Sequence, residues 1–569
     1  MHFVFERLND RKVVQWAIAY LAVAWVAIQL VDVLGDQFEW PLGVQKGITW
    51  VLVVGFVATI LTAFLHGISR GEAPLSSAKN QAPTAPATDR RVANSPGQAR
   101  LLSEGRAAVE RRAWRDAVEA LTAADATEKL SAAEDLDGLA EAAWWTGDLD
   151  VATSTRERAV AAYVERGDSE RAGLLAIRNA EDFAYQRADS VANGWLARAE
   201  RLLVEEAESV AHGHLQRLRS MRAMKHGDLD TALTLAKEVH SVGERHRDLD
   251  LQALSLQDQG RILIALGQVE AGLPLVDEAM ASAVSGELSL PTTGRLYCNM
   301  METCDKLSNF ERASQWNDVG TKWCQDYTES IFPGICRVYR AKILGLRGAW
   351  VEAQAEALKA SEELKHWLPV AGEAWYQIGE LRLRLGDLDA AESAFHQAHE
   401  LGREPFPGIA ELRWKKGHTD QARSLIDSAL ANRALDGPTR ARLLPTKISI
   451  AVAGDDLAAA QEALDKLSHI ADQYPSPALS ATVAEQGAEV ALHANRIDDA
   501  IWHARAAVKE WAEVGFPFET ARARLTLARS FLATGDSAPA ELELRAAKSA
   551  FERLGARPAI EETLGLLAE

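Results

Sequence analysis

The sequence predicts an all-α protein in which two transmembrane helices are followed by an α-solenoid of about twelve helix–turn–helix repeats. Two observations indicate this fold: a pair of long apolar segments near the amino terminus, and a motif that recurs through the rest of the chain. A chain of 569 residues is also too long for one compact core. Its composition, 47% hydrophobic and 25% charged, is that of a folded protein rich in helix-forming residues.

The two apolar segments cover about 13–34 and 47–65. The first carries a single charge, Asp32, and the second carries none. Each is close to the roughly 20 residues that cross a bilayer as a helix. Tryptophans lie near the expected membrane interfaces, as in an aromatic belt. We therefore expect residues 1–70 to form a membrane anchor, with Asp32 at the interface with water in preference to a functional intramembrane carboxylate.

Basic residues set the expected orientation of this anchor. Arg and Lys flank the outer ends of both segments, whereas the connecting loop holds only Lys46. The positive-inside rule then places both ends of the anchor in the cytoplasm. The alternative, a hairpin buried in a soluble protein, is less favoured because no other segment is apolar enough to cover it. Residues 71–98, rich in Ala, Pro, Ser and Thr, are expected to form a flexible linker with a reach of about 30 Å.

The remaining residues, 99–569, repeat one motif, which is clearest in the stretch GDLDAAESAF from Gly386 to Phe395. Aligned on Ala391, the motif occurs twelve times, mostly about 40 residues apart. The other aligned positions are Ala117, Ala152, Ala192, Ala232, Gly272, Ala313, Ala353, Ala422, Ala460, Ala500 and Ala540. An apolar residue often stands three positions earlier, and a second Ala often follows seven positions later.

This motif predicts two antiparallel helices per repeat. Glycine ends the first helix with a left-handed cap, and aspartate begins the second by accepting hydrogen bonds from free backbone N–H groups. The apolar residue fills the turn, and small residues seven apart share one helical face, where a neighbouring helix can approach closely. The carboxylates of GDLDAAESAF are therefore expected to cap helices or to face solvent, and not to form an acidic site.

The repeats resemble the tetratricopeptide repeat. Two units follow its W-x2-L-G…A-x3-F-x2-A pattern, through Trp375, Ile378, Gly379, Ala391, Phe395 and Ala398 and through Leu527, Ala528, Phe531, Ala540, Leu544 and Ala547. The period, however, is nearer 40 than 34 residues, and most units lack the usual terminal Pro. One unit is short, which leaves its register near 417–422 open.

A narrower resemblance covers about 100–565. Stretches such as EAAWWTGDLD and GWLARAERLL look like the repeat region attached to LuxR-type bacterial transcription regulators and to some adenylate cyclases. The amino-terminal FERLNDRKVVQWAIAYLAVAW resembles a membrane segment that precedes such repeats in bacterial multidomain proteins. The resemblance implies a sensory or protein-contacting module without its output domain, in a bacterial protein. Together with the positive-inside rule, this gives an expected location at the bacterial inner membrane, with the amino terminus and the repeats in the cytoplasm.

Several chemistries are not expected. The formal charge of −19 argues against a general nucleic-acid-binding surface. No G-x-x-x-x-G-K-[ST] phosphate loop occurs. The spacing of Cys298, Cys304, Cys324 and Cys336 matches no metal motif, so these thiols are expected to pack in the core. We expect no metal, no cofactor and no enzymatic activity.

The expected function is that of a membrane-anchored scaffold or regulatory adaptor that binds protein partners on the cytoplasmic side. The alternative is a sensor whose solenoid binds a small-molecule effector and modulates a separate transcription or signalling partner. Neither the partner nor the oligomeric state follows from the sequence. Because first helices line the concave face of such solenoids, six side chains are candidates for partner binding, although packing between repeats is the plainer interpretation of each: Trp144, Trp145, Tyr185, Arg340, Tyr376 and Arg382.

Overall fold

The computed structural model describes residues 96–325, 332–365, 367–432 and 435–568. The expected spans at 13–34 and 47–65, and most of the expected linker, lie outside these ranges. Within them, no helix combines the length and the hydropathy that crossing a membrane requires. The first helix, α4, begins at Pro96, slightly before the expected start of the solenoid at position 99.

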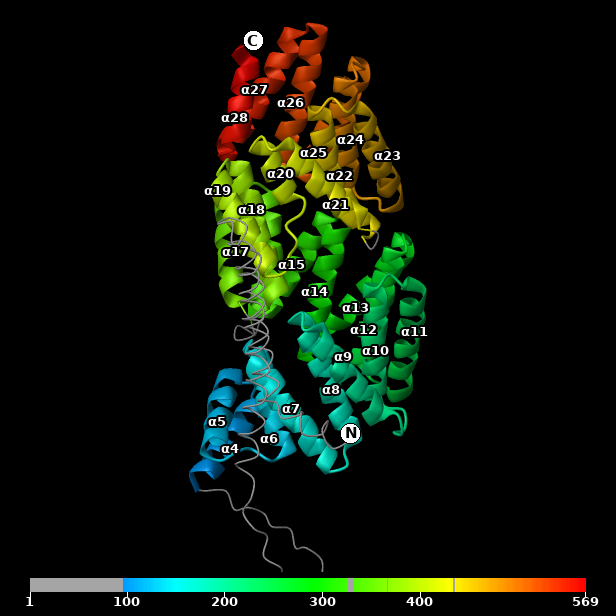
Figure 1. The fold of residues 1–569 in the computed structure, drawn as a ribbon, viewed down its shortest axis with the longest axis vertical. Coiled ribbons are helices and arrows are strands. Elements are labelled where there is room, and N and C mark those ends of the chain that lie inside the picture. Colours follow the sequence, from blue (N-terminus) through cyan, green and yellow to red (C-terminus); the bar gives the residue numbers. More distant parts are fainter. Residues whose placement is uncertain (1–95, 326–331, 366, 433–434, 569) are drawn as a thin grey trace, which may run out of the picture. The chain divides into compact units, whose positions relative to one another are not determined.

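Twenty-five helices and no strand make up the described residues (Figure 1). The helices are α4 (Pro96–Glu110), α5 (Trp114–Thr127), α6 (Ala133–Trp145), α7 (Leu149–Glu165), α8 (Ser169–Tyr185), α9 (Asp189–Leu203), α10 (Val210–Lys225), α11 (Leu229–His246), α12 (Leu249–Ala265), α13 (Val269–Ser285), α14 (Leu290–Lys306), α15 (Phe310–Gln325), α16 (Phe332–Leu346), α17 (Trp350–Glu363), α18 (Leu368–Leu385), α19 (Leu388–Glu400), α20 (Gly408–Lys415), α21 (Thr419–Ala431), α22 (Gly437–Ala453), α23 (Leu457–Gln473), α24 (Pro477–His493), α25 (Ile497–Val514), α26 (Pro517–Thr534), α27 (Ser537–Leu554) and α28 (Arg557–Ala568).

These helices form twelve successive pairs, from α4 with α5 to α26 with α27, and α28 follows the last pair. Each helix packs against the next one in the chain, as Figure 1 shows along the colour gradient. First helices of neighbouring pairs also contact one another, as α8, α10, α12 and α14 do in turn. First helices therefore lie on the inner side of the array, and second helices on the outer side. The structure confirms the expected all-α repeat architecture.

Turn chemistry explains the helix boundaries. Gly386 has φ of 83° and ends α18. Asp387 then accepts a hydrogen bond from the backbone N–H of Ala390 and begins α19. The same left-handed glycine ends first helices at Gly147, Gly227, Gly267, Gly348 and Gly535. Only glycine adopts this conformation without a steric cost.

The aligned small residues lie in the helix interfaces, as the motif predicts. All twelve are buried, and nine of them are 0% exposed. The single glycine among them has a physical reason, because a Cβ on Gly272 of α13 would lie 2.5 Å from the carbonyl oxygen of Gly260 in α12. The short repeat keeps the register, since Ala422 of α21 is fully buried although α20 spans only 8 residues.

The chain also returns on itself, which the repeat pattern does not predict. One apolar cluster joins residues 253–313 of α12–α15 to residues 441–490 of α22–α24. A second cluster joins Trp114 and Trp145 to Phe332 and Trp367. Ion pairs and hydrogen bonds link the same regions, including Tyr474 Oη, which donates to the carbonyl of Ala265 at 3.2 Å. The array is therefore held by contacts between distant repeats as well as between neighbours.

Candidate functional site

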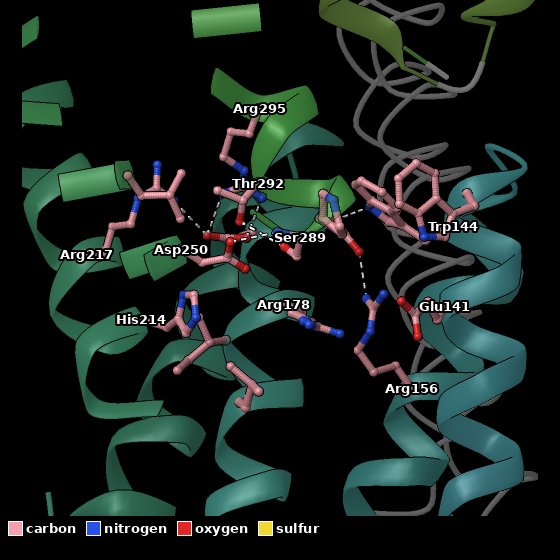
Figure 2. Close-up of a pocket in the computed structure, with 17 residues that line it drawn as sticks. Glu141, Trp144, Arg156, Arg178, His214, Arg217, Asp250, Ser289, Thr292 and Arg295 are labelled. Atoms are coloured by element: carbon pink, nitrogen blue, oxygen red, sulfur yellow. Dashed lines mark hydrogen bonds and ion pairs between the residues drawn. The ribbon is translucent and has the colours of Figure 1, made fainter. Parts of the chain in front are cut away.

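The inner helices of the second to sixth repeats surround a pocket of about 130 Å³. Helices α6, α8, α10, α12 and α14 all contribute to its walls, and α7 supplies Arg156 (Figure 2). Apolar side chains make up part of the lining, among them Trp144, Leu174, Ile177 and Leu254. The rest is strongly charged: four arginines and four carboxylates face the cavity. A pocket with an apolar wall and a few convergent charged groups is typical of a ligand site.

Most of these charges neutralise one another. Arg156 is 3% exposed and donates from Nη1 to Asp182 Oδ2 at 2.6 Å and to Asn179 Oδ1 at 3.0 Å. Asp182 also accepts a hydrogen bond from Trp144 Nε1, at 3.2 Å. Arg295 forms a bidentate ion pair with Glu181, in which both N–O distances are 3.0 Å. Such paired, planar contacts hold the guanidinium groups in fixed positions.

The same network pairs Arg217 and determines the charge of His214. Arg217 is 2% exposed and pairs with Asp258, with Nε 2.7 Å from Oδ2. Burial lowers the pKa of His214 to about 4, against the opposing charge of Glu181. The imidazole of His214 is therefore neutral at physiological pH. Burial by itself would raise the pKa of Glu181, but Arg295 and Arg217 outweigh burial and lower this pKa to about 2.

Arg178 and Glu141 differ from the other charged groups in the pocket. In the described part of the chain, neither side chain has a hydrogen-bond or ion-pair partner, although both line the cavity. Figure 2 shows Arg178 in the middle of the pocket with its guanidinium directed toward Arg156 and Glu141, and no dashed line reaches it. Burial lowers the pKa of Arg178 and Arg156 lowers it further, whereas Asp137 and Glu141 oppose this shift. Because arginine keeps its proton even so, Arg178 is an uncompensated positive charge.

The structure places two of the sequence-predicted side chains in this pocket. Trp144 and Trp145 both line it. Trp145 is 1% exposed and stacks on Trp114 with ring centroids 5.3 Å apart, so its ring is mainly a packing element. Trp144 contacts Trp367 at 5.9 Å between centroids and also holds Asp182. Of the predicted residues, Trp144 is thus the one best placed to contact a ligand in this pocket.

The other four predicted residues lie outside this pocket, each on a first helix as expected. Tyr185 packs against Trp367 at 5.3 Å between centroids. Tyr376 is buried under the guanidinium of Arg403, 4.1 Å from its ring centroid. Arg382 donates to Asp387 at 3.0 Å and joins α18 to α19. Arg340 is exposed. Whether any of these side chains contacts a partner stays a prediction.

The arginines of the pocket were not among the site residues predicted from the sequence. Arg178, Glu181 and Asp182 stand in the run GLLAIRNAEDFAY of α8, where polar residues interrupt an otherwise apolar first helix. That interruption is the local signal that could have drawn attention to them, because charges on a buried face need partners or a ligand. Arg156 and Arg295 lie far from α8 in the sequence, and no local pattern connects them to it.

A second, larger cavity of about 690 Å³ runs along the inner helices of the last repeats. Side chains from α18, α20, α22, α24, α26 and α28 line this groove. Trp414, Trp511 and Phe518 contribute aromatic surface. Six glutamates and four basic side chains face it: Glu380, Glu411, Glu485, Glu489, Glu519 and Glu562 against Arg384, Lys415, Arg522 and Arg529. The groove is therefore larger and more acidic than the pocket between α6 and α14.

Two cysteines, Cys304 and Cys324, are buried in the core as expected, and Cys298 and Cys336 are partly buried against it. Cys304 is 1% exposed and Cys324 is 5% exposed. Cys324 and Cys336 are both free thiols, and their Sγ atoms are 3.0 Å apart. In the described ranges, no three His, Cys, Asp or Glu side chains come together in an arrangement that would hold a metal ion.

No protein-family model matches the sequence, and no curated protein matches it. Similar solved structures include the APC/C hetero-tetramer Cut9–Hcn1, at 12% identity and a TM-score of 0.37, with 82% of this chain and 96% of that chain covered. Yeast Tom70 is another, at 15% identity and a TM-score of 0.28, with coverage of 83% and 96%. Because both TM-scores are low, the fold and site described above rest on this chain's own helices and contacts.

Proposed function

We propose that this protein is a scaffold or regulatory adaptor that binds a protein partner in the groove formed by α18–α28. The observation that carries the proposal is the groove itself, about 690 Å³ in volume and lined by six successive inner helices. A cavity that extends over so many elements fits an extended peptide or a helix better than a compact small molecule. Stacked helical repeats commonly offer such surfaces to protein segments.

The lining indicates the chemistry of that partner. Several glutamates are partly satisfied within the groove, for example Glu485, which accepts from Trp511 Nε1 at 3.0 Å and pairs with Arg522 at 3.1 Å. The carboxylates nevertheless outnumber the cations. Complementarity then favours a partner segment that carries lysine or arginine together with apolar side chains for Trp414 and Phe518. A surplus of charge of one sign along a binding groove steers association and makes its rate depend on salt.

The proposal includes membrane attachment through the expected spans at 13–34 and 47–65, with the repeats on the cytoplasmic side. Its support is the sequence pattern of apolar segments and flanking basic residues. Protease treatment of intact spheroplasts tests the orientation. The repeats are expected to resist digestion until the membrane is permeabilised, and digestion from the periplasmic side would contradict the proposed topology.

Site-specific photo-crosslinking tests the proposed groove. A crosslinking amino acid at His493, an exposed residue that lines the groove, is expected to capture a stoichiometric partner from detergent-solubilised membranes. The matched control places the same group at Val351, which is 82% exposed on the outer helix α17. Equal capture from both positions, or capture from Val351 alone, would overturn the assignment of the groove. The partner is expected to dissociate more readily as salt rises.

A second function is favoured by the pocket between α6 and α14. Its small volume and unpaired Arg178 suit a small charged effector, so the protein would act as a sensor that modulates a separate signalling partner. Both functions can reside in one chain, because the pocket and the groove are lined by different helices. Ligand-dependent change in the His493 crosslinking yield would link them.

A further inference from the structure

The pocket between α6 and α14 contains a positive and a negative group that its own structure leaves unused. Of its four arginines, Arg156, Arg217 and Arg295 are held by Asp182, Asp258 and Glu181. Of its four carboxylates, Asp250 accepts the backbone N–H of Ser289 at 2.9 Å at the start of α14. Only Arg178 and Glu141 keep their full hydrogen-bonding capacity.

These two groups do not satisfy each other. Arg178 of α8 and Glu141 of α6 influence one another electrostatically, but they form no ion pair. Arg178 is partly buried, and a guanidinium that faces a cavity without an ion-pair partner leaves donors that a ligand can use. The same argument applies, with opposite sign, to a carboxylate that faces the cavity. The space between the two groups is therefore matched to a molecule with separated positive and negative ends.

We propose that this pocket binds a small zwitterion of the free α-amino acid class, whose carboxylate contacts Arg178 and whose ammonium group contacts Glu141. A guanidinium holds a carboxylate through two parallel hydrogen bonds, which fixes its plane as well as its position. The neutral His214 adds hydrogen-bonding capacity without adding charge. The inference rests on the effector-binding function proposed above and does not depend on the adaptor function.

The apolar part of the lining selects the side chain of the ligand. Leu174, Ile177, Leu254 and the ring of Trp144 face the same cavity. Its volume of about 130 Å³ is close to that of cavities that hold one benzene ring, which corresponds to roughly six to ten non-hydrogen atoms. A single amino acid with an apolar side chain of the size of valine, leucine or methionine fits this volume, whereas a peptide does not.

Isothermal titration calorimetry with the full chain in detergent tests the proposal directly. L-Leucine, L-valine, L-methionine and L-phenylalanine serve as probes, and at least one is expected to bind with a dissociation constant below about 1 mM, as a few charge-assisted hydrogen bonds provide. Two analogues of leucine separate the ends of the zwitterion: 4-methylpentanoate lacks the ammonium group, and 3-methylbutan-1-amine lacks the carboxylate. Each is expected to bind at least about tenfold more weakly than leucine.

Substitutions assign the two ends to the two residues. Arg178→Gln is expected to weaken amino-acid binding by about 10- to 100-fold while leaving the affinity for the amine unchanged. Glu141→Gln is expected to weaken amino-acid binding while leaving the affinity for 4-methylpentanoate unchanged. Arg201→Gln and Glu110→Gln are matched controls, because both side chains are exposed and lie outside the pocket, and neither change should alter binding. Arg178→Lys keeps the charge and guards against a loss of binding through misfolding.

Three outcomes would overturn the inference. In the first, none of the four amino acids binds. In the second, 4-methylpentanoate binds as tightly as leucine and Glu141→Gln has no effect, which would make the pocket a simple anion site. In the third, binding persists unchanged in folded Arg178→Gln, which would place the amino acid elsewhere. If amino acids fail but a different small molecule raises the melting temperature of the protein, the sensor function stands and only the ligand class is wrong.

Discussion

Arg442 of α22 pairs with Asp305 of α14 across 137 residues of chain, with Nη2 2.6 Å from Oδ2. Lys342 of α16 forms an ion pair with the other carboxylate oxygen of Asp305, with Nζ 2.5 Å from Oδ1. Asp305 thus connects its own repeat to the next repeat and to the distant repeat of α22. Burial of its carboxylate is outweighed by the two cations, which hold its pKa below the ordinary value. This one carboxylate is a test of how strongly the distant contacts stabilise the array.

Asp305→Asn is expected to lower the free energy of unfolding by about 2 kcal/mol, between the cost of breaking an exposed pair and that of breaking a fully buried one. Both cations would lose their counter-charge at a partly buried site. Urea unfolding of the full chain, followed by circular dichroism, measures the change. Asp427→Asn is the control, because the Asp427–Lys447 pair is more exposed and local, and its loss should cost about 0.5 kcal/mol or less. Equal effects of the two changes would contradict a special role for Asp305.

Glu181 predicts a defined dependence of stability on pH. Its pKa in the folded protein, about 2, is below the unfolded value, so its ionised form stabilises the fold above the unfolded pKa and this contribution is lost as pH falls toward 2. The difference in unfolding free energy between the wild type and Glu181→Gln should therefore shrink by about 1 kcal/mol between pH 6.5 and pH 3.5. Arg295, Arg217, His214 and Asp182 are common to both proteins, so the difference isolates Glu181. A difference that does not change with pH would contradict the pairing.

Arg178 is expected to cost stability in the absence of ligand. Because it has no partner, Arg178→Met removes a partly buried charge without breaking an ion pair, and should leave the melting temperature unchanged or raise the unfolding free energy by about 1 kcal/mol. Arg156→Met is the contrast, since it leaves Asp182 buried without its cation and should cost about 3 kcal/mol. The melting temperatures of both variants, measured by thermal unfolding, test this difference. A strong destabilisation by Arg178→Met would show that Arg178 has a structural role.

Gly272 and Gly194 are expected to respond oppositely to alanine. At Gly272 the new Cβ would collide with the Gly260 carbonyl and with Ile264, so Gly272→Ala should cost about 2 kcal/mol. At Gly194, inside α9, a Cβ meets nothing within 4 Å, so Gly194→Ala should stabilise the protein by about 0.5–1 kcal/mol through helix propensity. Urea midpoints measure both changes. The same sign for both would contradict the close approach of α12 and α13.

The thiols are expected to react slowly in the folded protein. Burial raises the pKa of Cys298 and raises that of Cys304 to about 12, and the hydrogen bond with Cys336 together with burial raises that of Cys324. Since the thiolate is the reactive form, iodoacetamide at pH 7.5 should label these cysteines at least about tenfold more slowly than in the urea-unfolded chain. Mass spectrometry of the labelled peptides gives each rate. Labelling at the unfolded rate would place the thiols in solvent.

The local features of the fold could be predicted because their causes are local. Gly386, Asp387, Leu388 and Ala391 each act within a few residues, as a cap, a turn filler or a small contact, and the structure has them in those roles. Repetition of the same chemistry then predicted about twelve helical pairs and the register of all but the short repeat near 417–422, whose register the structure supplies. The expected anchor depends on residues outside the described ranges and stays a prediction.

The site could be predicted only in part, because charge pairing is not local. Trp144 was identifiable as an aromatic residue on a first helix, and it does line the pocket. Arg178 has no partner, whereas the two carboxylates that follow it in α8 pair with Arg156 and Arg295. These two arginines come from other helices, α7 and α14. Likewise the Arg442–Asp305 pair depends on the small rotation between successive repeats, summed over many of them. The sequence pattern of a single repeat does not predict this accumulated rotation.

The hydrogen bond from Tyr474 to the carbonyl of Ala265 has a consequence for how this chain can evolve. In an open array, one repeat can be gained or lost by duplication or deletion, because each unit touches only its neighbours. Here the end of α23 contacts the end of α12. Inserting or removing a single repeat between them would displace all of these contacts between distant repeats at once. The repeat number of this protein is therefore constrained, and sequence change should proceed by substitution within the twelve pairs.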